Sequence, residues 1–122
     1  MQRMTEEEKA KKDAVAAYLS RYGPAHENNE SLKQLEKSDY TIAQTKRNEA
    51  IMEEVKTVIA LLDVTRGKTV IEKKFIGGLP WRKIWKDMDI SRDTGYKYYR
   101  EAMLQLYDIM IEQGIDFGHQ TP

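Results

Sequence analysis

Cysteine is absent from this chain of 122 residues, and proline and long apolar runs are scarce. Without cysteine, neither a disulfide framework nor a cysteine-ligated zinc site is available, which favours a reducing compartment. No apolar run approaches the roughly 20 residues of a membrane-spanning helix. Residues 1–12 lack the apolar core of a secretory signal. We therefore expect a cytoplasmic protein that makes no contact with a membrane.

Charge is balanced over the whole chain but not along it. Twenty basic residues stand against twenty acidic ones, which argues against indiscriminate binding of polyanions. Residues 66–100, however, hold ten basic and four acidic residues, a local net charge of about +6. A basic stretch of this kind is the electrostatic pattern expected of a nucleic-acid-binding surface.

Residues 69–107 show a helix, a glycine turn, a short helix, a tight turn and a long helix. The apolar residues of the first helix are Val70, Ile71, Phe75 and Ile76, and those of the second are Trp81, Ile84, Trp85 and Met88. Gly77 and Gly78 are expected to end the first helix, and Pro80 suits the first position of the second. Ser91 is placed to cap the third. This succession predicts a helix-turn-helix.

The third helix runs without a breaker from Ser91 to Gly114, and its side chains divide into two sets. An inward stripe at helical spacing consists of Tyr98, Ala102, Leu106 and Ile109. An outward set near the beginning consists of Arg92, Asp93, Tyr96, Lys97 and Arg100. Because packing does not require the outward set, it is the candidate functional face.

The N-terminal part is predicted to contain one helix and a loop. Thr5 and Glu8 form a capping-box pattern at the helix start. A thin apolar stripe follows, made of Ala14, Ala17 and Tyr18. Gly23 and Pro24 are expected to break the helix, and residues 25–30 are polar enough for a loop. The stripe is too thin for a core and predicts packing on a second copy, as a homodimer.

A long amphipathic helix is predicted over residues 39–62, with Gly67 as the pivot of the turn that follows at residues 63–68. The apolar positions of this helix are Ile42, Ile51, Val55, Val58, Ile59 and Leu62. We expect them to pack against the inward stripe of the last helix. Residues 31–37 fit either a short helix or the first turns of this long one.

The chain as a whole is therefore predicted to be all-α and to have three parts. Residues 1–38 form an N-terminal helical extension. Residues 39–113 form the helix-turn-helix domain together with its preceding long helix. Residues 114–122 form a tail, because Gly114 is placed as the left-handed residue that ends the last helix.

Local matches to chemical motifs fail on spacing. Residues 67–69 contain the GKT of a phosphate-binding loop, but the earlier glycine of that motif is replaced by Leu62. The start of a calcium loop is imitated by Asp87, Asp89, Ser91 and Asp93. Arg92 stands at the glycine position of that loop, and Tyr98 at its glutamate position. Two histidines lack companion ligands, namely His26 and His119. We expect no enzyme activity, no metal and no cofactor.

The outward set and the basic residues of the preceding helices fit two roles in binding double-stranded DNA. In a helix-turn-helix, the start of the last helix presents side chains to base edges in the major groove. The residues placed to read bases are Arg92, Asp93, Tyr96 and Lys97. Basic residues nearby hold phosphates, which fix register without reading sequence. The residues placed to hold phosphates are Lys73, Lys74, Arg82, Lys83, Lys86 and Arg100.

Two short motifs give the chain a resemblance to a known family. An aromatic-isoleucine-glycine turn lies at residues 75–81, and an Ile-Ser turn lies at residues 90–94. Later positions of the pattern are Tyr96, Ala102 and Leu106. In these features the chain resembles region four of sigma factors and, more closely, the phage-encoded late regulators of the RinA and ArpU type. The resemblance covers about residues 39–110 and implies a transcriptional activator of late phage genes.

Two other roles fit the same residues. The first is a small terminase subunit, which also binds DNA through a helix-turn-helix and forms helical oligomers. The second is an interaction module without DNA contact, which binds bacterial RNA polymerase through the basic face. Lysines and arginines on helices are also common on ordinary solvated surfaces, so the basic excess alone does not decide among these roles.

The chain departs from the family pattern at two positions. Trp85 stands where the family favours a small residue, and Gly95 stands where it favours a β-branched one. We interpret the two as one compensated exchange, in which Gly95 gives back the space that Trp85 fills between the second and third helices. In the alternative, Trp85 rotates onto the outer surface and Gly95 only loosens its helix.

Overall fold

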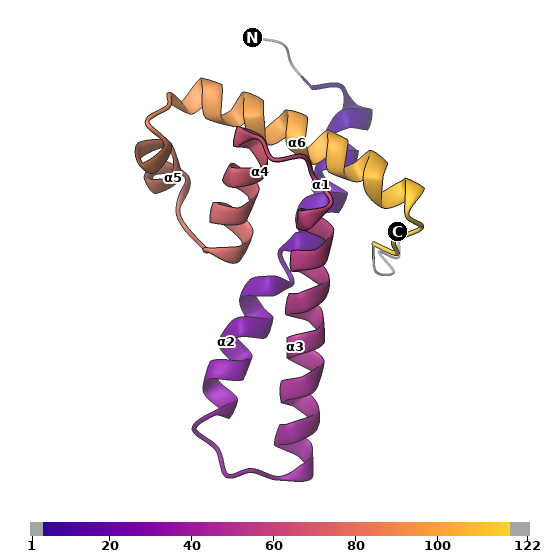
Figure 1. Cartoon of the computed structure of the whole chain (residues 1–122), viewed down its shortest axis with the longest axis vertical. Helices are drawn as coiled ribbons and strands as arrows, with labels where there is room; N and C mark the ends of the chain where they lie inside the picture. Colours follow the sequence, from indigo (N-terminus) through magenta and orange to yellow (C-terminus); the bar gives the residue numbers. More distant parts are fainter. Residues whose placement is uncertain (1–3, 118–122) are drawn as a thin grey trace.

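The computed structural model describes residues 4–117, and every regular element among them is helical. In chain order the elements are α1 (Glu6–Leu19), α2 (Tyr22–Leu32), α3 (Asp39–Ala60), α4 (Arg66–Ile71), the π-helical turn η1 (Glu72–Ile76), α5 (Trp81–Met88) and α6 (Arg92–Glu112). In Figure 1, α2 and α3 project as a pair, which we call the arm. The elements α1, α4, η1, α5 and α6 form what we call the head. The predicted all-α class is confirmed for these residues.

The predicted capping box begins α1. The Thr5 hydroxyl accepts from the Glu8 backbone N–H at 3.0 Å, and the Glu8 carboxylate accepts from the Thr5 backbone N–H at 3.0 Å. These bonds satisfy two N–H groups that the start of a helix leaves unpaired. No helix within residues 4–117 is long and apolar enough to cross a bilayer.

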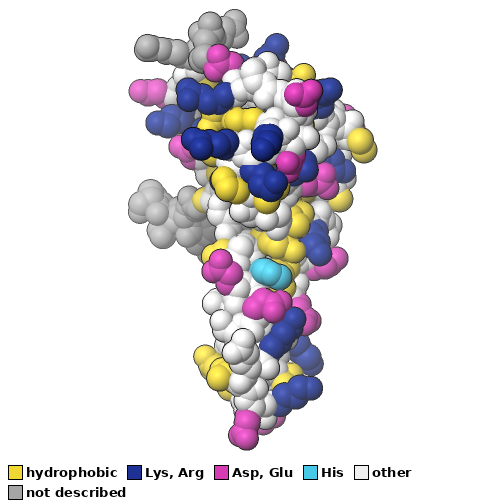
Figure 2. Space-filling model, turned by 90° about the vertical axis from the view of Figure 1, so that its left-hand side faces the viewer, with side chains coloured by type: hydrophobic (Ala, Val, Ile, Leu, Met, Phe, Trp, Pro, Cys, Tyr) yellow, Lys and Arg dark blue, Asp and Glu magenta, His cyan; other side chains and the backbone are white. Residues whose placement is uncertain are grey.

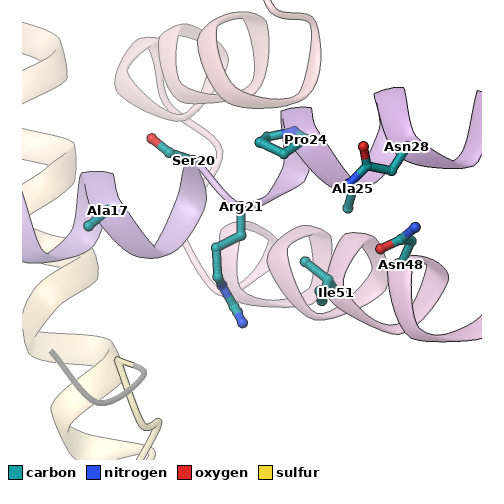
Figure 3. Close-up of a pocket in the computed structure, with 8 residues that line it drawn as sticks. All are labelled: Ala17, Ser20, Arg21, Pro24, Ala25, Asn28, Asn48 and Ile51. Atoms are coloured by element: carbon teal, nitrogen blue, oxygen red, sulfur yellow. The ribbon is translucent and has the colours of Figure 1, made fainter. Parts of the chain in front are cut away.

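Glu54 on α3 holds the end of α1. The Tyr18 hydroxyl donates to a Glu54 carboxylate oxygen at 2.5 Å, and a guanidinium nitrogen of Arg21 lies 3.2 Å from the same oxygen. Burial and this hydrogen bond both raise the pKa of Tyr18, which keeps its phenol protonated. Figure 3 shows Arg21 at the bend between α1 and α2, beside a hollow of about 370 Å³ that Ser20 and Pro24 also line.

The first helix ends close to the predicted point, at Leu19, but Gly23 and Pro24 do not cause the break, because α2 runs through both residues. This helix begins at Tyr22, so Pro24 occupies its first turn. Backbone N–H groups of the first turn have no partner inside the helix, and proline removes no helical hydrogen bond there. Residues 25–30, predicted as a loop, therefore continue the helix, and the undecided residues 31–37 divide between the end of α2 and the link to α3.

The long helix predicted over residues 39–62 is confirmed as α3, but the predicted partner, α6, is not the helix that α3 mainly packs on. α3 packs mainly along α2, whereas α6 packs against α4 and α1. The C-terminal part of α3 enters the core through Val55, Val58 and Ile59, while Ile42 near its start is exposed. Helical spacing identified the apolar face of α3, but it carried no information about which helix covers that face.

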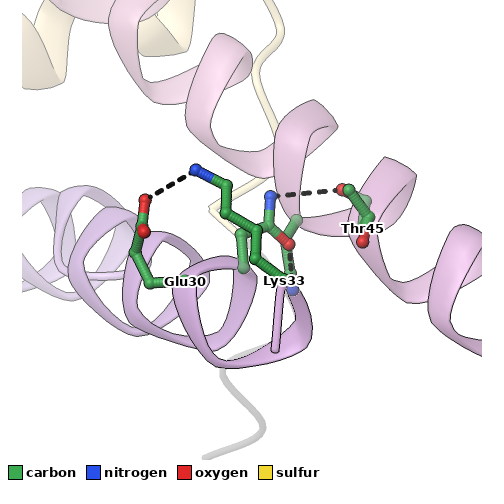
Figure 4. Close-up of polar contacts among 5 residues, drawn as sticks. Glu30, Lys33 and Thr45 are labelled. Carbon is green, nitrogen blue, oxygen red and sulfur yellow. Dashed lines mark hydrogen bonds and ion pairs between the residues drawn. The ribbon is translucent and has the colours of Figure 1, made fainter. Parts of the chain in front are cut away.

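Polar groups hold α2 to α3 in the middle of the arm. The Asn48 side-chain amide donates to the Asn29 side-chain oxygen at 2.9 Å, and the Asn29 amide donates to the Thr45 carbonyl at 3.4 Å (Figure 4). Both asparagines are buried. An exposed ion pair of 3.0 Å between Glu30 and Lys33 lies nearby. Because a buried amide without a partner costs about 1–3 kcal/mol, the asparagine pair sets the register of the two helices.

One apolar core joins the head to the end of α3. Its members are Val15, Tyr18, Leu19, Tyr22, Val55, Val58, Ile59, Leu62, Val70, Ile71, Ile84, Trp85, Tyr99, Ala102, Met103, Leu106 and Met110. This core spans both sides of the boundary predicted at residue 38, because α1 packs on α6. Tyr18 was predicted to lie on a homodimer surface, yet it is 1% exposed. Tyr18 is therefore wrong as a residue of such a surface, whereas Ala14 is half-buried and Ala17 is exposed, and self-association stays a prediction.

Gly114 ends α6 as predicted. It has a φ of +67°, and its N–H donates to the Ile111 carbonyl at 3.1 Å. The Ile115 N–H donates to the Met110 carbonyl at 2.9 Å, which completes a Schellman motif. Phe117, within the predicted tail, packs against the core.

Gly67 lies inside α4, so the predicted turn that pivots at this residue is wrong. Thr65 caps α4, and its hydroxyl accepts from the Lys68 N–H at 3.3 Å. A Cβ atom on Gly67 would lie 2.7 Å from the Ala102 Cβ and 2.8 Å from the Tyr98 carbonyl oxygen. Neither of these α6 atoms is the end of a flexible side chain. The missing side chain therefore allows α4 and α6 to approach closely.

We predict that Gly67→Ala destabilises the protein by about 1–3 kcal/mol, because overpacking exceeds the helix preference of about 1 kcal/mol for alanine. Gly23→Ala is the matched control, since a Cβ atom there meets nothing within 4 Å in another helix. It should stabilise the protein by about 0.4–1 kcal/mol. Urea unfolding followed by circular dichroism measures both values. Equal stabilisation by the two substitutions would contradict the close approach of α4 and α6.

Candidate nucleic-acid interface

The chain passes from α4 to α5 through η1 and two glycines. The Gly77 N–H donates to the Glu72 carbonyl at 2.9 Å, which is the five-residue spacing of a π-helix. Gly78 has a φ of +66°, and the Leu79 N–H donates to the Lys73 carbonyl at 3.1 Å. The predicted end of this helix at the two glycines is confirmed. The wider π-helical turn had no signal in the sequence.

The short helix α5 has the predicted apolar face. Pro80 is its N-cap and Trp81 its first helical residue, one position later than predicted. Ile84 and Trp85 are buried, while Trp81 and Met88 pack half-buried against the core. The buried pair directs the opposite side of α5, which is basic, toward solvent.

Aromatic rings fill the space between α5 and the beginning of α6. Trp81 and Trp85 stack with their centroids 5.2 Å apart. The Tyr96 ring lies 5.3 Å from Trp81 and 5.2 Å from Trp85, and Tyr99 meets Trp81 edge-on at 4.9 Å. The Lys74 ammonium lies 4.7 Å from the Trp81 ring centroid, a cation–π distance. These contacts fix α5 relative to the start of α6.

The predicted turn between α5 and α6 is confirmed. Asp89 has a φ of 54°, a left-handed conformation that aspartate adopts more readily than most residues. The Ser91 hydroxyl accepts from the Thr94 N–H at 3.1 Å and so caps α6. Asp93 lies in the first turn, where a negative charge favours the N-terminal end of a helix.

The buried face of α6 differs from the predicted stripe at two positions. Ala102 and Leu106 are buried as predicted, but Tyr99 rather than Tyr98 is the buried tyrosine, and Ile109 is half-buried. Burial raises the pKa of Tyr99 to about 12, so this phenol is neutral at physiological pH. Because α4 and α1 both cover α6, its buried surface is wider than one stripe.

The residues predicted to read bases are all exposed at the beginning of α6; they are Arg92, Asp93, Tyr96 and Lys97. Tyr96 is 39% exposed, and the rest of its ring packs on Trp81 and Trp85. This tyrosine is therefore held in place while part of it faces solvent. The four residues share the end of α6 that is next to α5.

The crossing of α1 limits the exposed face of α6 (Figure 1). Met103 and Met110 follow Arg92 at helical spacing on the same face, yet both are fully buried. Arg100 is half-buried at the edge of this crossing. The pKa of Glu8 on α1 is lowered, mainly by the hydrogen bond from the backbone N–H of Thr5 and to a smaller extent by the positive charge of Arg100. Arg100 thus faces the acidic start of α1, which weakens its assignment to a phosphate.

Three of the predicted phosphate contacts line one hollow on the outside of α5. Arg82, Lys83 and Lys86 surround it together with Pro80, and its volume is about 460 Å³. Figure 2 looks onto this side and shows Lys and Arg side chains around an apolar patch in the upper part of the molecule. Lys83 also lies 3.5 Å from Asp87, but an exposed ion pair of this kind contributes little.

The two remaining candidates for phosphate contact are on η1. Lys73 and Lys74 are half-buried and do not line the hollow on α5. Lys74 is in addition engaged with the ring of Trp81. The predicted phosphate contacts therefore fall into two sets. Three cations on α5 are exposed, and the other three, Lys73, Lys74 and Arg100, are half-buried.

Metal-ligating side chains do not gather in this region. Within residues 4–117, no group of three or more His, Asp or Glu side chains is placed to hold a metal ion. His26 stacks on Tyr22 with the ring centroids 6.3 Å apart. His119 lies outside the described residues.

Comparisons of the chain with family models, with curated proteins and with solved structures found no match. The grounds for a function are therefore the geometry of the described residues, their charge and the motifs of residues 75–94.

Trp85 packs directly on Gly95, as we inferred from the two departures from the family pattern. A Cβ atom on Gly95 would lie 2.5 Å from Cε3 and 2.9 Å from Cδ2 of the Trp85 ring. Trp81 and Tyr96 hold this ring from other sides. Trp85 is 7% exposed, so the alternative in which it turns onto the surface is wrong. The contact is confirmed, and its energetic coupling stays a prediction.

We predict a positive coupling between these two residues. Gly95→Ala alone should destabilise the protein by about 1–3 kcal/mol, because the new methyl group meets the indole ring. Trp85→Ala alone should cost about 3–5 kcal/mol through the cavity that it leaves. The double variant should recover about 1–3 kcal/mol relative to the sum of the single effects, as contacting residues do. Chemical unfolding of the four proteins measures the coupling, and additive effects would contradict it.

Proposed function

We propose that the head binds double-stranded DNA as a helix-turn-helix, with α6 as the recognition helix and α5 as the helix that precedes it. The observation that carries the proposal is the exposure of Arg92, Tyr96 and Lys97 at the start of α6, together with the cation-lined hollow on the outer side of α5, the helix that packs on this end of α6. Recognition helices present base-reading side chains from this end. A neighbouring cation cluster would bind the phosphates on one side of the groove.

Electrostatics supports a polyanionic partner for this face in particular. The chain has no net charge, so the basic excess of about +6 in residues 66–100 is balanced by acidic residues elsewhere. Arg82, Lys83 and Lys86 are exposed within one small area, where each would release a counterion from a phosphate. The ring cluster below them holds α5 and α6 in a fixed relation, which a protein needs to place both elements on one duplex.

The biological role that we propose is transcription regulation, as a phage-encoded activator of late genes. This step rests on the resemblance of residues 75–94 to sigma region four and to the RinA and ArpU regulators. A small terminase subunit would use the same face on packaging-site DNA, and gene neighbourhood separates the two roles. A regulator gene is expected at the end of an early or middle cluster, and a terminase gene beside that of the large subunit.

The first prediction from this proposal is a strong salt dependence of DNA affinity. With about three to five phosphate contacts, from the three exposed cations of α5 and up to two lysines of η1, the logarithm of the association constant should fall with the logarithm of salt concentration at a slope of about −3 to −4.5. Lys86→Ala should reduce the magnitude of this slope by about 1. Fluorescence anisotropy with labelled genomic fragments measures both slopes. A flat salt dependence would contradict DNA binding and leave contact with RNA polymerase as the better assignment.

The second prediction separates base reading from phosphate binding. Arg92→Ala should lose about 1–3 kcal/mol of affinity for the selected site and relax its preference at one base position. Lys83→Ala should weaken binding to all sequences alike, since phosphates carry no sequence information. Lys56→Ala is the control for the loss of one exposed cation, because Lys56 lies on α3. Selection of bound fragments with each variant gives the preferences, and identical profiles for the Arg92 and Lys83 variants would contradict the groove assignment.

A further inference from the structure

The outer end of the arm exposes large apolar side chains. Leu35 is 58% exposed, Tyr40 is 70% exposed and Ile42 is 45% exposed. They lie on the link between α2 and α3 and on the first turn of α3. Leu35 and Ile42 line a groove of about 400 Å³, together with Leu32 and Thr41. We call this end of the arm, residues 30–49, the tip.

The contacts inside the arm do not account for these apolar residues. Buried polar contacts join α2 to α3 where the tip meets the rest of the arm, through Asn29, Asn48 and the Thr45 carbonyl. Such a pair sets register but adds little net stability. Most helical stability comes from packing an apolar face, and the tip leaves its apolar residues facing solvent. A cluster of exposed apolar residues of this kind marks an interaction surface.

We propose that the tip binds the tip of a second copy of this chain. The charge of the tip supports this partner. Residues 30–49 hold four basic residues and four acidic ones, so their balance favours neither a strongly acidic nor a strongly basic partner. Three lysines and one glutamate border the groove, namely Lys33, Lys37, Lys46 and Glu49. Two further acidic residues, Glu36 and Asp39, are exposed on the link to α3 and at the start of this helix. In a two-fold interface each copy offers its acidic group to the basic group of the other.

The position of the tip keeps this interface apart from the proposed DNA-binding face. Figure 1 shows the tip at the end of the molecule opposite α5 and α6. A dimer formed through the tips leaves Arg92 and the hollow on α5 uncovered. Self-association therefore does not depend on DNA, and it can be measured in its absence. Failure of the dimer and failure of DNA binding are thus separate results.

Sedimentation equilibrium of the full chain without DNA tests the proposal. The small apolar contact predicts a dissociation constant on the order of micromolar, so concentrations of about 1–200 μM span the transition. The wild-type chain should approach twice its mass of 14.2 kDa at the upper end. The double variant Leu35→Glu and Ile42→Glu should stay a monomer over this range, a loss of affinity of at least about 100-fold. Circular dichroism verifies that its helices are retained.

Val64→Glu is the matched control, because Val64 is 92% exposed and lies outside the tip. It should dimerise like the wild-type chain. A wild-type chain that remains monomeric at the highest concentration would overturn the proposal. So would a dimer that the tip variant preserves, or one that Val64→Glu disrupts equally, since either result would place the interface elsewhere.

The absence of cysteine provides a second, covalent readout. A single cysteine introduced by Tyr40→Cys would lie within the proposed interface, and mild oxidation should convert most of the chain into a disulfide-linked dimer at dimer-forming concentrations. Val64→Cys, at the exposed position outside the tip, should cross-link at least about 10-fold more slowly. Equal rates for the two variants would show that collisions, not a specific interface, bring the chains together.

Discussion

Close packing on α6 is the constraint on which the head depends. Two neighbouring helices, α4 and α5, contact α6 at positions that are occupied by glycine. Gly67 brings α4 against Ala102 and the Tyr98 carbonyl, and Gly95 makes room for the ring of Trp85 from α5. Protein interiors are filled to nearly crystalline density, so a single added carbon at either contact would force neighbouring atoms to shift. The positions of α4 and α5 relative to α6 follow from these two contacts.

The same packing decides what remains at the surface. α1 covers the second half of α6 and buries Met103 and Met110, while the beginning of the helix stays open beside α5. Tyr96 belongs to both regions, because it packs on two tryptophans and remains 39% exposed. The candidate interface is therefore a rigid part of the head. A fixed arrangement of α5 and α6 supports the proposed recognition of one form of DNA.

The arm is held together by different contacts from those of the head. Its helices meet through a buried asparagine pair, and its apolar residues at the tip face outward. In the head, α1 packs its apolar side on α6 within the same chain, and this buries Tyr18, which was first expected to contact a second copy. An exposed apolar surface is thus present at one end of the molecule and a basic surface at the other, and each carries one of the two partners that we propose.

The sequence by itself determined those features that short-range chemistry controls. Hydrogen bonds or spacing within a few residues control the caps at Thr5 and Ser91 and the helix ends at Gly78 and Gly114. They also control the long helix over residues 39–62. The exposed positions at the start of α6 followed from the same spacing. The contact of Trp85 with Gly95 could also be predicted, because an unusually large residue on one helix pointed to an unusually small one on the next.

Only the tertiary structure decided which surfaces meet. Pro24 continues α2 because the bend falls just before that helix, which places the proline in a first turn. A glycine suits a turn and a close contact between helices equally well. Only the position of α6 shows that Gly67 serves the second purpose. Tyr98 and Tyr99 are adjacent and equally apolar, so the helices that cover α6 select Tyr99 for the core. Helical period shows that a face is buried, but the geometry of the partner decides where that face lies and what covers it.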